Sequence, residues 1–221
     1  MNVSFKRIFL AFLLSMLIIF NIRSCLPRFQ TIDTIQVEIT DSGIKPSNVD
    51  LSVYLDTGQP DVTLIKDQKM ILITGPIDAS TATKFKSLLT NDINTVAISS
   101  PGGEIISAID IANEIYQQGI DTFIPSEGGC FSGCTIIFQA GKRRIAYENS
   151  MLMYHSAKLK LPNGDNQVSA YGTSIYWAYL MMFDINPSII YMMENMETDY
   201  LITAINSKKY NIATGIIMLD K

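Results

Sequence analysis

The sequence contains very little histidine and cysteine. Among 221 residues there is one histidine, His155, and there are three cysteines, Cys25, Cys130 and Cys134. A single histidine excludes histidine-rich metal sites, and the three cysteines do not have the spacing of a zinc site. If imidazole performs acid–base chemistry in this protein, His155 must be the residue that does so.

Charged residues are also scarce, at 17% of the chain against 48% hydrophobic residues, which is unlike a disordered chain. The length suits one domain with an appendage. Four of the 17 basic residues lie at or before residue 28, whereas all 21 acidic residues lie beyond it, so the rest of the chain has a net charge of −8. An acidic body argues against nucleic acid as a partner.

An apolar run at residues 8–22 follows the basic residues Lys6 and Arg7. This order is typical of a secretory signal, although the run is slightly short for a spanning helix. The residues after it lack the small side chains of a good cleavage site. We therefore expect residues 1–26 to be a signal or, in preference, an uncleaved anchor in the inner membrane, with the body outside the cytoplasm. A cleaved signal stays open, and a buried core helix is the weakest alternative.

Residues 27–68 form a predicted β-rich extension, with alternating apolar residues at 35–39 and a second strand pattern at 51–55. From residue 69 to 221 short apolar runs alternate with helical patterns. We expect strands at 70–73, 95–98, 121–124, 144–147 and 151–155, and helices at 78–89, 104–118 and 132–140. In the longest helix, Ile106 should widen the apolar face that contains Ile105 and Ile109. The alternation predicts an α/β fold with mainly parallel pairing.

Three segments combine turn glycines with reactive side chains. Residues 99–103, Ser-Ser-Pro-Gly-Gly, lie between a strand and a helix, where glycines let backbone N–H groups approach a ligand; a turn without a ligand is equally compatible. Residues 128–134, Gly-Gly-Cys-Phe-Ser-Gly-Cys, lead into a helix. Ser132 is there either a nucleophile, whose oxyanion the helix start would stabilise, or a helix cap.

The third segment is the apolar strand that ends at His155, which lies 23 residues after Ser132. A lone histidine can be a core residue, but serine becomes nucleophilic only when a base such as imidazole takes its proton. The imidazole in turn needs a carboxylate to orient it. Asp199 is the candidate, because it precedes the apolar stretch 200–202.

These landmarks occur in the order found in a known family. Residues 69–217 resemble the Clp peptidase family of serine proteases, whose motifs match Ile73-Thr74-Gly75-Pro76, the Ser-Pro-Gly-Gly turn, the serine turn, Gly141-Lys142-Arg143, the strand ending in His155, the segment Asp199–Ala204 and Tyr210-Asn211-Ile212. The resemblance implies a ClpP/crotonase-like α/β fold, a repeated ββα spiral. A crotonase-type acyl-CoA enzyme shares the fold, but the serine turn argues against that activity.

The resemblance assigns a role to each site residue. Ser132 would be the nucleophile, His155 the general base and Asp199 the group that orients His155, while the backbone N–H groups of Gly103 and Gly133 would form the oxyanion hole. An extended peptide would be aligned by strand addition beside the turn before Glu104. Some membrane-bound relatives use a Ser–Lys pair instead. If the alignment slips after His155, the orienting acid would be Asp184, Glu194 or Glu197.

Two further features stay open. Cys130 and Cys134 flank Ser132, and at a helix start their Cα atoms would be about 6 Å apart, so they are either a disulfide or two buried thiols. The segment between His155 and Asp199 corresponds to the handle by which rings of cytoplasmic relatives stack. Its residues Tyr176, Trp177, Met181 and Met182 are either an oligomer surface or core.

The sequence thus predicts an extracytoplasmic serine endopeptidase, anchored by residues 8–22, which acts on peptides or unfolded proteins without a metal or organic cofactor. A homo-oligomer is compatible with the resemblance. A non-catalytic, membrane-tethered binding module with the same fold is the main alternative. A hydrolase of small acyl substrates is the third.

Overall fold

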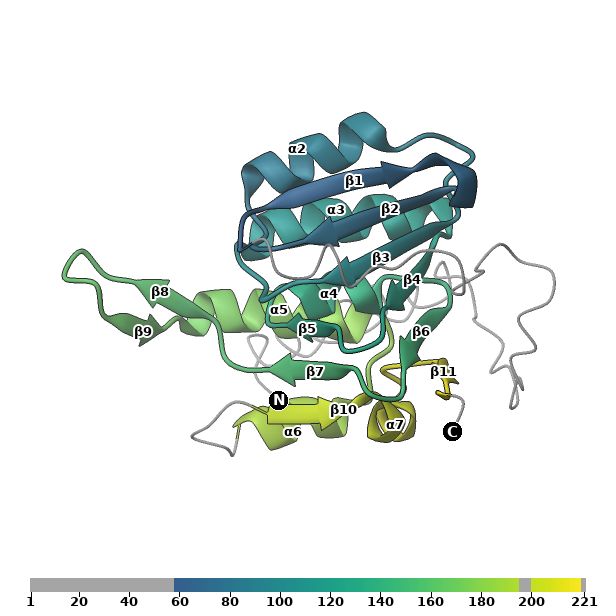
Figure 1. The fold of residues 1–221 in the computed structure, drawn as a ribbon. Helices are drawn as coiled ribbons and strands as arrows, with labels where there is room; N and C mark the ends of the chain where they lie inside the picture. The colour runs from purple at the N-terminus through teal and green to yellow at the C-terminus, as the bar shows by residue number, and fades with distance from the viewer. Residues whose placement is uncertain (1–57, 195–199, 220–221) are drawn as a thin grey trace, which may run out of the picture. The chain divides into compact units, whose positions relative to one another are not determined.

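The computed structural model describes residues 58–194 and 200–219, and every structural statement below concerns these residues (Figure 1). The predicted membrane anchor, the two strand patterns within residues 35–55, Cys25 and Asp199 lie outside them. Within the described ranges, no helix combines the length and the apolar character needed to cross a bilayer.

A six-stranded sheet forms the centre of the described part. Its order is β1-β2-β3-β4-β6-β11, with β1 at Asp61–Ile65, β2 at Met70–Thr74, β3 at Thr95–Ser99, β4 at Asp121–Ile124, β6 at Arg144–Tyr147 and β11 at Gly215–Ile217. Only β1 runs antiparallel to its neighbour within this sheet. All of β2 is buried, and its sequence is an almost continuous apolar run, as expected for a parallel strand that is covered on both faces of the sheet. The expected α/β fold with mainly parallel pairing is confirmed, and β1, which we assigned to the extension, is an edge strand of this sheet.

The two long predicted helices are present with their expected ends. Helix α2 spans Ala79–Leu88, and the Asp78 side chain caps it by accepting from the Thr81 backbone N–H. Helix α3 spans Ile105–Gln118 and ends at Gly119, whose φ of 64° is left-handed. The expectation for Ile106 is wrong, because its side chain is 64% exposed. At 3.6 residues a turn, Ile106 lies opposite the buried stripe of α3.

A smaller sheet carries the serine turn. It has the order β10-β7-β5, with β5 at Gly129–Phe131, β7 at Met151–Tyr154 and β10 at Tyr200–Thr203. Strand β5 is parallel to β7, and β10 is antiparallel to it. Helix α4, at Cys134–Gln139, follows β5 and is entirely buried. It is shorter than the predicted helix 132–140, because Ser132 has a left-handed backbone.

The C-terminal half adds a hairpin and several helices. Strands β8 (Lys158–Lys160) and β9 (Asn166–Val168) pair antiparallel and extend away from the two sheets (Figure 1). The remaining elements are α5 at Ala170–Met182, α6 at Pro187–Glu194, α7 at Ala204–Ser207 and the 3-10 turns η3 at Lys66–Gln68 and η4 at Lys208–Tyr210.

Helix α5 divides the residues for which core packing and an oligomer surface were both open. Tyr176 is buried in the core, and Trp177 is partly buried against it. Met181 and Met182 are about half exposed. Core packing is therefore confirmed for Tyr176 and Trp177, whereas an oligomer surface stays a prediction for Met181 and Met182.

Candidate active site

Two neighbouring parallel strands bring Ser132 and His155 to the same edge of the small sheet. Phe131 of β5 is paired with Met153 of β7, and the Ser132 backbone N–H donates to the Met153 carbonyl at 2.9 Å. Ser132 directly follows β5, and His155 directly follows β7. Because the strands are parallel, both residues leave the sheet at its carboxyl edge.

Ser132 lies in a sharp turn between strand and helix. Its φ of 54° is in the left-handed region, which a residue with a side chain rarely adopts. The N-cap of α4 is Gly133, and Ser132 Oγ makes no hydrogen bond to another described residue. The serine therefore does not act as a helix cap, and its hydroxyl is available for chemistry.

A buried chain of hydroxyl groups supports this turn. The Ser132 carbonyl accepts from the Thr135 backbone N–H at 2.9 Å and from Thr135 Oγ1 at 2.6 Å. Since that bond uses the Thr135 hydroxyl proton, the Tyr176 hydroxyl, 2.6 Å from Thr135 Oγ1, must be the donor to it. Burial raises the pKa of Tyr176 well above its ordinary value, so the phenol keeps this proton.

The glycine turn 102–103 packs directly against the serine turn. A Cβ on Gly102 would be 2.8 Å from Ser132 Cβ and 2.9 Å from the Gly133 nitrogen, so only glycine fits there. A Cβ on Gly133 would be 3.5 Å from the Gly103 nitrogen. Gly103 is bridged to Ile77, whose carbonyl accepts from Glu104 at 2.8 Å.

Gly103 and Gly133 lie close together, and their backbone N–H groups are unused. Neither donates to a backbone or side-chain acceptor within the described ranges. Two free backbone donors beside a serine are the arrangement that stabilises the oxyanion of an acyl-transfer intermediate.

His155 has a defined tautomer. Its Nδ1 lies 2.7 Å from the Ser156 carbonyl oxygen, which can only accept, so Nδ1 carries the proton. In the neutral ring Nε2 is then free to accept a proton, as a base toward serine requires. No hydrogen bond joins His155 to Ser132 in this structure. In proteins without substrate such contacts are often long and tighten on binding.

The structure gives indirect information on the orienting acid. Asp199 lies outside the described residues, but Tyr200 after it pairs with Tyr154, the residue before His155. Asp184, an alternative acid, accepts from the Asn211 side chain with both its backbone carbonyl and Oδ2, at 2.7 and 3.0 Å. The Glu194 side chain and Glu197 lie outside the described set.

Cys130 and Cys134 are joined by a disulfide, with their Cα atoms 5.3 Å apart. Both residues are fully buried. Of the two open alternatives, the structure therefore contains the disulfide, which brackets Ser132.

Sequence reasoning missed Thr135 and Tyr176. Thr135 could have been found from its spacing, because a threonine three residues after Ser132 can donate its hydroxyl back to the Ser132 carbonyl. Tyr176 is 41 residues further along the chain from Thr135 and carries no such signal.

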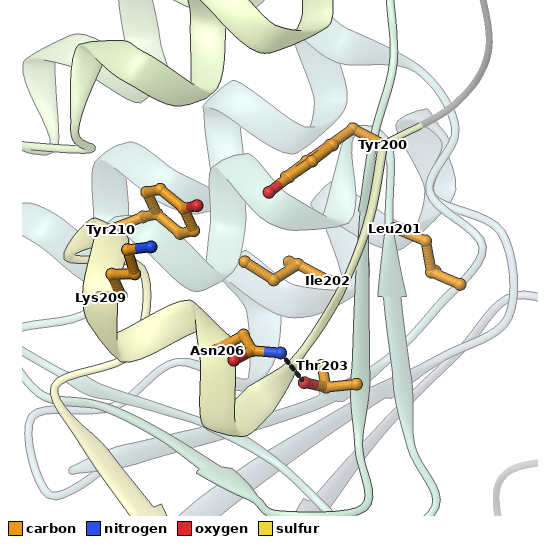
Figure 2. Close-up of a pocket in the computed structure, with 7 residues that line it drawn as sticks. All are labelled: Tyr200, Leu201, Ile202, Thr203, Asn206, Lys209 and Tyr210. Atoms are coloured by element: carbon orange, nitrogen blue, oxygen red, sulfur yellow. Dashed lines mark hydrogen bonds between the residues drawn. The ribbon is translucent and has the colours of Figure 1, made fainter.

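A pocket of about 230 Å³ lies beside β10 (Figure 2). The hydroxyl groups of Tyr200 and Tyr210 point toward each other there, and Leu201 points away. Burial and the neighbouring Tyr210 raise the pKa of Tyr200. Asn206 donates to Thr203 Oγ1 at 3.1 Å. Neither Ser132 nor His155 lines this pocket, so the serine chemistry is assigned to the turn itself.

The fold and the serine turn define the class of a serine peptidase with a mixed α/β fold. The sequence model of the Clp protease family matches residues 59–219, and the chain belongs to this family of serine peptidases. The match begins at residue 59, ten residues before residue 69, where the resemblance in the sequence begins, and it therefore includes β1.

Solved structures share the fold. The catalytic domain of the ClpP protease from Plasmodium falciparum is 23% identical, with a TM-score of 0.56 over 73% of this chain and 96% of that one. ClpP1 from Listeria monocytogenes is 19% identical, with a TM-score of 0.56 over 69% and 93%. The membrane-bound stomatin-specific protease 1510-N is 19% identical, with a TM-score of 0.55 over 66% and 77%. No curated protein matches the chain.

Proposed function

We propose that the protein is a serine endopeptidase in which Ser132 is the nucleophile and His155 the general base. In the acylation step Ser132 Oγ attacks the peptide carbonyl while His155 Nε2 takes the hydroxyl proton. The imidazolium then gives that proton to the leaving amine, and water hydrolyses the acyl-enzyme by the same route. The observation that carries this proposal is the unbonded Ser132 hydroxyl beside the free N–H groups of Gly103 and Gly133.

The oxyanion hole and the orienting acid complete the proposed machinery. Gly103 and Gly133 would donate to the oxyanion, and the close fit of Gly102 against Ser132 supports that geometry. Asp199 is proposed to orient His155, on the support that Tyr200 and Tyr154 are paired. The Ser156 carbonyl already favours the tautomer that this carboxylate would select.

The proposed substrates are extended peptides or unfolded proteins. Gly103 forms a parallel bridge with Ile77, and the exposed start of α3 follows it, which suits the addition of an extended chain. One of the similar structures, of the stomatin-specific protease, is a complex with a substrate peptide.

We also propose an extracytoplasmic location, with residues 8–22 as the inner-membrane anchor and no nucleic-acid partner. Support comes from the basic residues Lys6 and Arg7 before the apolar run and from the acidic body. An alkaline phosphatase fused to the C-terminus, which is active only outside the cytoplasm, should be active in a Gram-negative host. Activity of a cytoplasmic reporter at the same position instead would contradict this location.

The peptidase proposal is tested by labelling the full chain with a fluorophosphonate probe. Wild type should label, Ser132→Ala should not, and His155→Ala should label on the order of 10³-fold more slowly. Asp199→Asn should slow labelling by about 100-fold, less than usual for a triad carboxylate, because the Ser156 carbonyl still holds the tautomer.

The matched control is Ser174→Ala, since Ser174 lies on the exposed face of α5 and bonds only the Ala170 carbonyl of its own helix. It should label at the wild-type rate. Absence of Ser132-dependent labelling in the folded protein would refute the peptidase and leave the non-catalytic binding module. Ready turnover of small esters with no cleavage of unfolded proteins would favour the acyl hydrolase.

A further inference from the structure

Ser132 occupies the middle of a small ring closed by the Cys130–Cys134 disulfide. Cys130 is the central residue of β5, and Cys134 is the first residue of α4. The bond therefore joins the end of the strand to the start of the helix, on either side of the nucleophile. Both cysteines are fully buried, whereas Ser132 is partly exposed, so the cross-link does not cover the serine.

The turn needs an external constraint because its conformation is unfavourable. Ser132 has a φ of 54°, and a serine free to choose would populate other regions of backbone space. The Ser132 N–H and carbonyl each have a partner, Met153 and Thr135. Those bonds hold the peptide groups of the serine, whereas the disulfide limits how far its two flanking residues can separate.

The ring is short, so its effect on the unfolded chain is smaller than that of a disulfide closing a long loop. The entropy that a cross-link removes from the unfolded state grows with the length of the closed loop, and here the sequence separation is four. In the folded protein it constrains the geometry of residues 131–133, which lie between the two cysteines. These residues lie against Gly102, where a Cβ would already be too close to them.

We propose that the Cys130–Cys134 disulfide positions Ser132, keeping its Oγ aimed at the reacting carbonyl carbon while the Gly103 and Gly133 N–H groups can donate to the carbonyl oxygen. This inference rests on the proposed peptidase function and adds a dependence on oxidation state. A phosphine reductant converts the bond to two thiols and is oxidised to the phosphine oxide, with water supplying the oxygen and the two protons. The turn then relaxes, and acylation slows.

The first test compares variants of the full chain by fluorophosphonate labelling. Cys130→Ala/Cys134→Ala should lower the maximal labelling rate constant at least tenfold, with the probe's apparent affinity within twofold of wild type. Circular dichroism and melting temperature establish that the variant is folded. The matched control is Cys25→Ala, which removes a cysteine outside the pair and should label as wild type. If the disulfide only stabilised the fold, its removal would lower the melting temperature without lowering the maximal labelling rate constant of the folded protein.

The second test reduces the folded wild type and remains informative if the double variant does not fold. Tris(carboxyethyl)phosphine is raised until alkylation finds two new thiols. The labelling rate constant of the reduced wild type should fall by the same factor as in the double cysteine variant and should recover on reoxidation. The labelling rate constant of the double variant should not change when the phosphine is added.

Two results overturn the inference. One is an unchanged labelling rate after loss of the disulfide in the folded protein, and the other is alkylation of Cys130 and Cys134 without reduction. If oxidised wild type shows no Ser132-dependent labelling, the proposed peptidase function fails instead. Ser132-dependent labelling that ignores the disulfide refutes only the positioning role.

Discussion

Backbone conformation at single residues determines which side chains the site tolerates. Gly102 has a φ of 88°, and a Cβ added to it would be 2.4 Å from the Phe131 carbonyl oxygen and 2.8 Å from Ser132 Cβ. Gly164, in the hairpin between β8 and β9, has a φ of 90° but has open space where a Cβ would be. The two glycines therefore have nearly the same positive φ, but only Gly102 has other atoms where a Cβ would lie.

Gly102→Ala should strongly slow labelling of Ser132, whereas Gly164→Ala should not. Both substitutions put a Cβ at positive φ, at a cost of about 1 kcal/mol in the free energy of unfolding. Only the first also forces the serine turn away from the glycine turn, and a shift of about 1 Å there should slow labelling by about 100-fold. Labelling rates and melting temperatures measure the two effects separately. Equal labelling rates for the two variants would contradict the packing argument.

At the scale of elements, helix α5 stabilises the start of α4 through one buried hydroxyl pair. Tyr176 of α5 donates to Thr135, which donates to the Ser132 carbonyl. The phenol has a raised pKa because burial disfavours its charged form. Its folded-state pKa lies above the unfolded value, so its contribution to stability is complete below about pH 10 and is lost as the pH rises through the folded-state pKa.

Tyr176→Phe should therefore have two effects. It should lower the free energy of unfolding near pH 7 by about 1 kcal/mol, the usual worth of one hydrogen bond. It should also make the loss of stability above about pH 10 shallower, because the buried phenol no longer has to ionise on unfolding. Melting temperatures from pH 7 to 11 measure both. Tyr171→Phe is the control, since Tyr171 is 79% exposed on the same helix. An identical pH profile for the two variants would show that Tyr176 has no such role.

For the whole molecule, the β8–β9 hairpin is notable because it exposes apolar side chains that lie outside the hydrophobic core. Leu159 and Val168 are 59% and 60% exposed, and neither belongs to the hydrophobic core. The hairpin lies in the segment between His155 and Asp199, where the resemblance leads us to expect an oligomer surface. If the protein forms a homo-oligomer, which is compatible with the resemblance, these apolar side chains are candidates for its interface.

Leu159→Lys/Val168→Lys should reduce the molar mass of the assembly in sedimentation without unfolding the protein. The substitutions leave the core intact, so circular dichroism should not change. Met218→Lys is the control, because Met218 is 61% exposed near the C-terminal end and away from the hairpin in sequence. A wild type that sediments as a monomer would refute the oligomer, and an unchanged mass in the double variant would exclude the hairpin as its interface.

Much of the fold was predictable because its signals are local. Buried parallel strands are continuous apolar runs, as in β2, and helix ends have recognisable caps, as at Asp78 and Gly119. The site motifs were also visible in the sequence. Glycines mark the turn at residues 102–103 and the turn that contains Ser132, and His155 ends an apolar strand. Ile106 was wrongly placed because an apolar residue in the first turn of a helix need not face the core.

The sequence by itself determined the order of strands and helices, the chemistry available at Ser132 and His155, and the presence of two cysteines around the serine. These depend on periodicity and spacing along the chain. Tertiary structure alone decided that Tyr176 reaches Thr135, that Gly102 touches Ser132, and that His155 bonds the Ser156 carbonyl. The Tyr176–Thr135 and Gly102–Ser132 contacts join residues that are distant in the sequence, and the His155 hydrogen bond depends on the rotamer of its side chain. Distant contacts and rotamers are set by tertiary packing, which the spacing of residues along the chain does not encode.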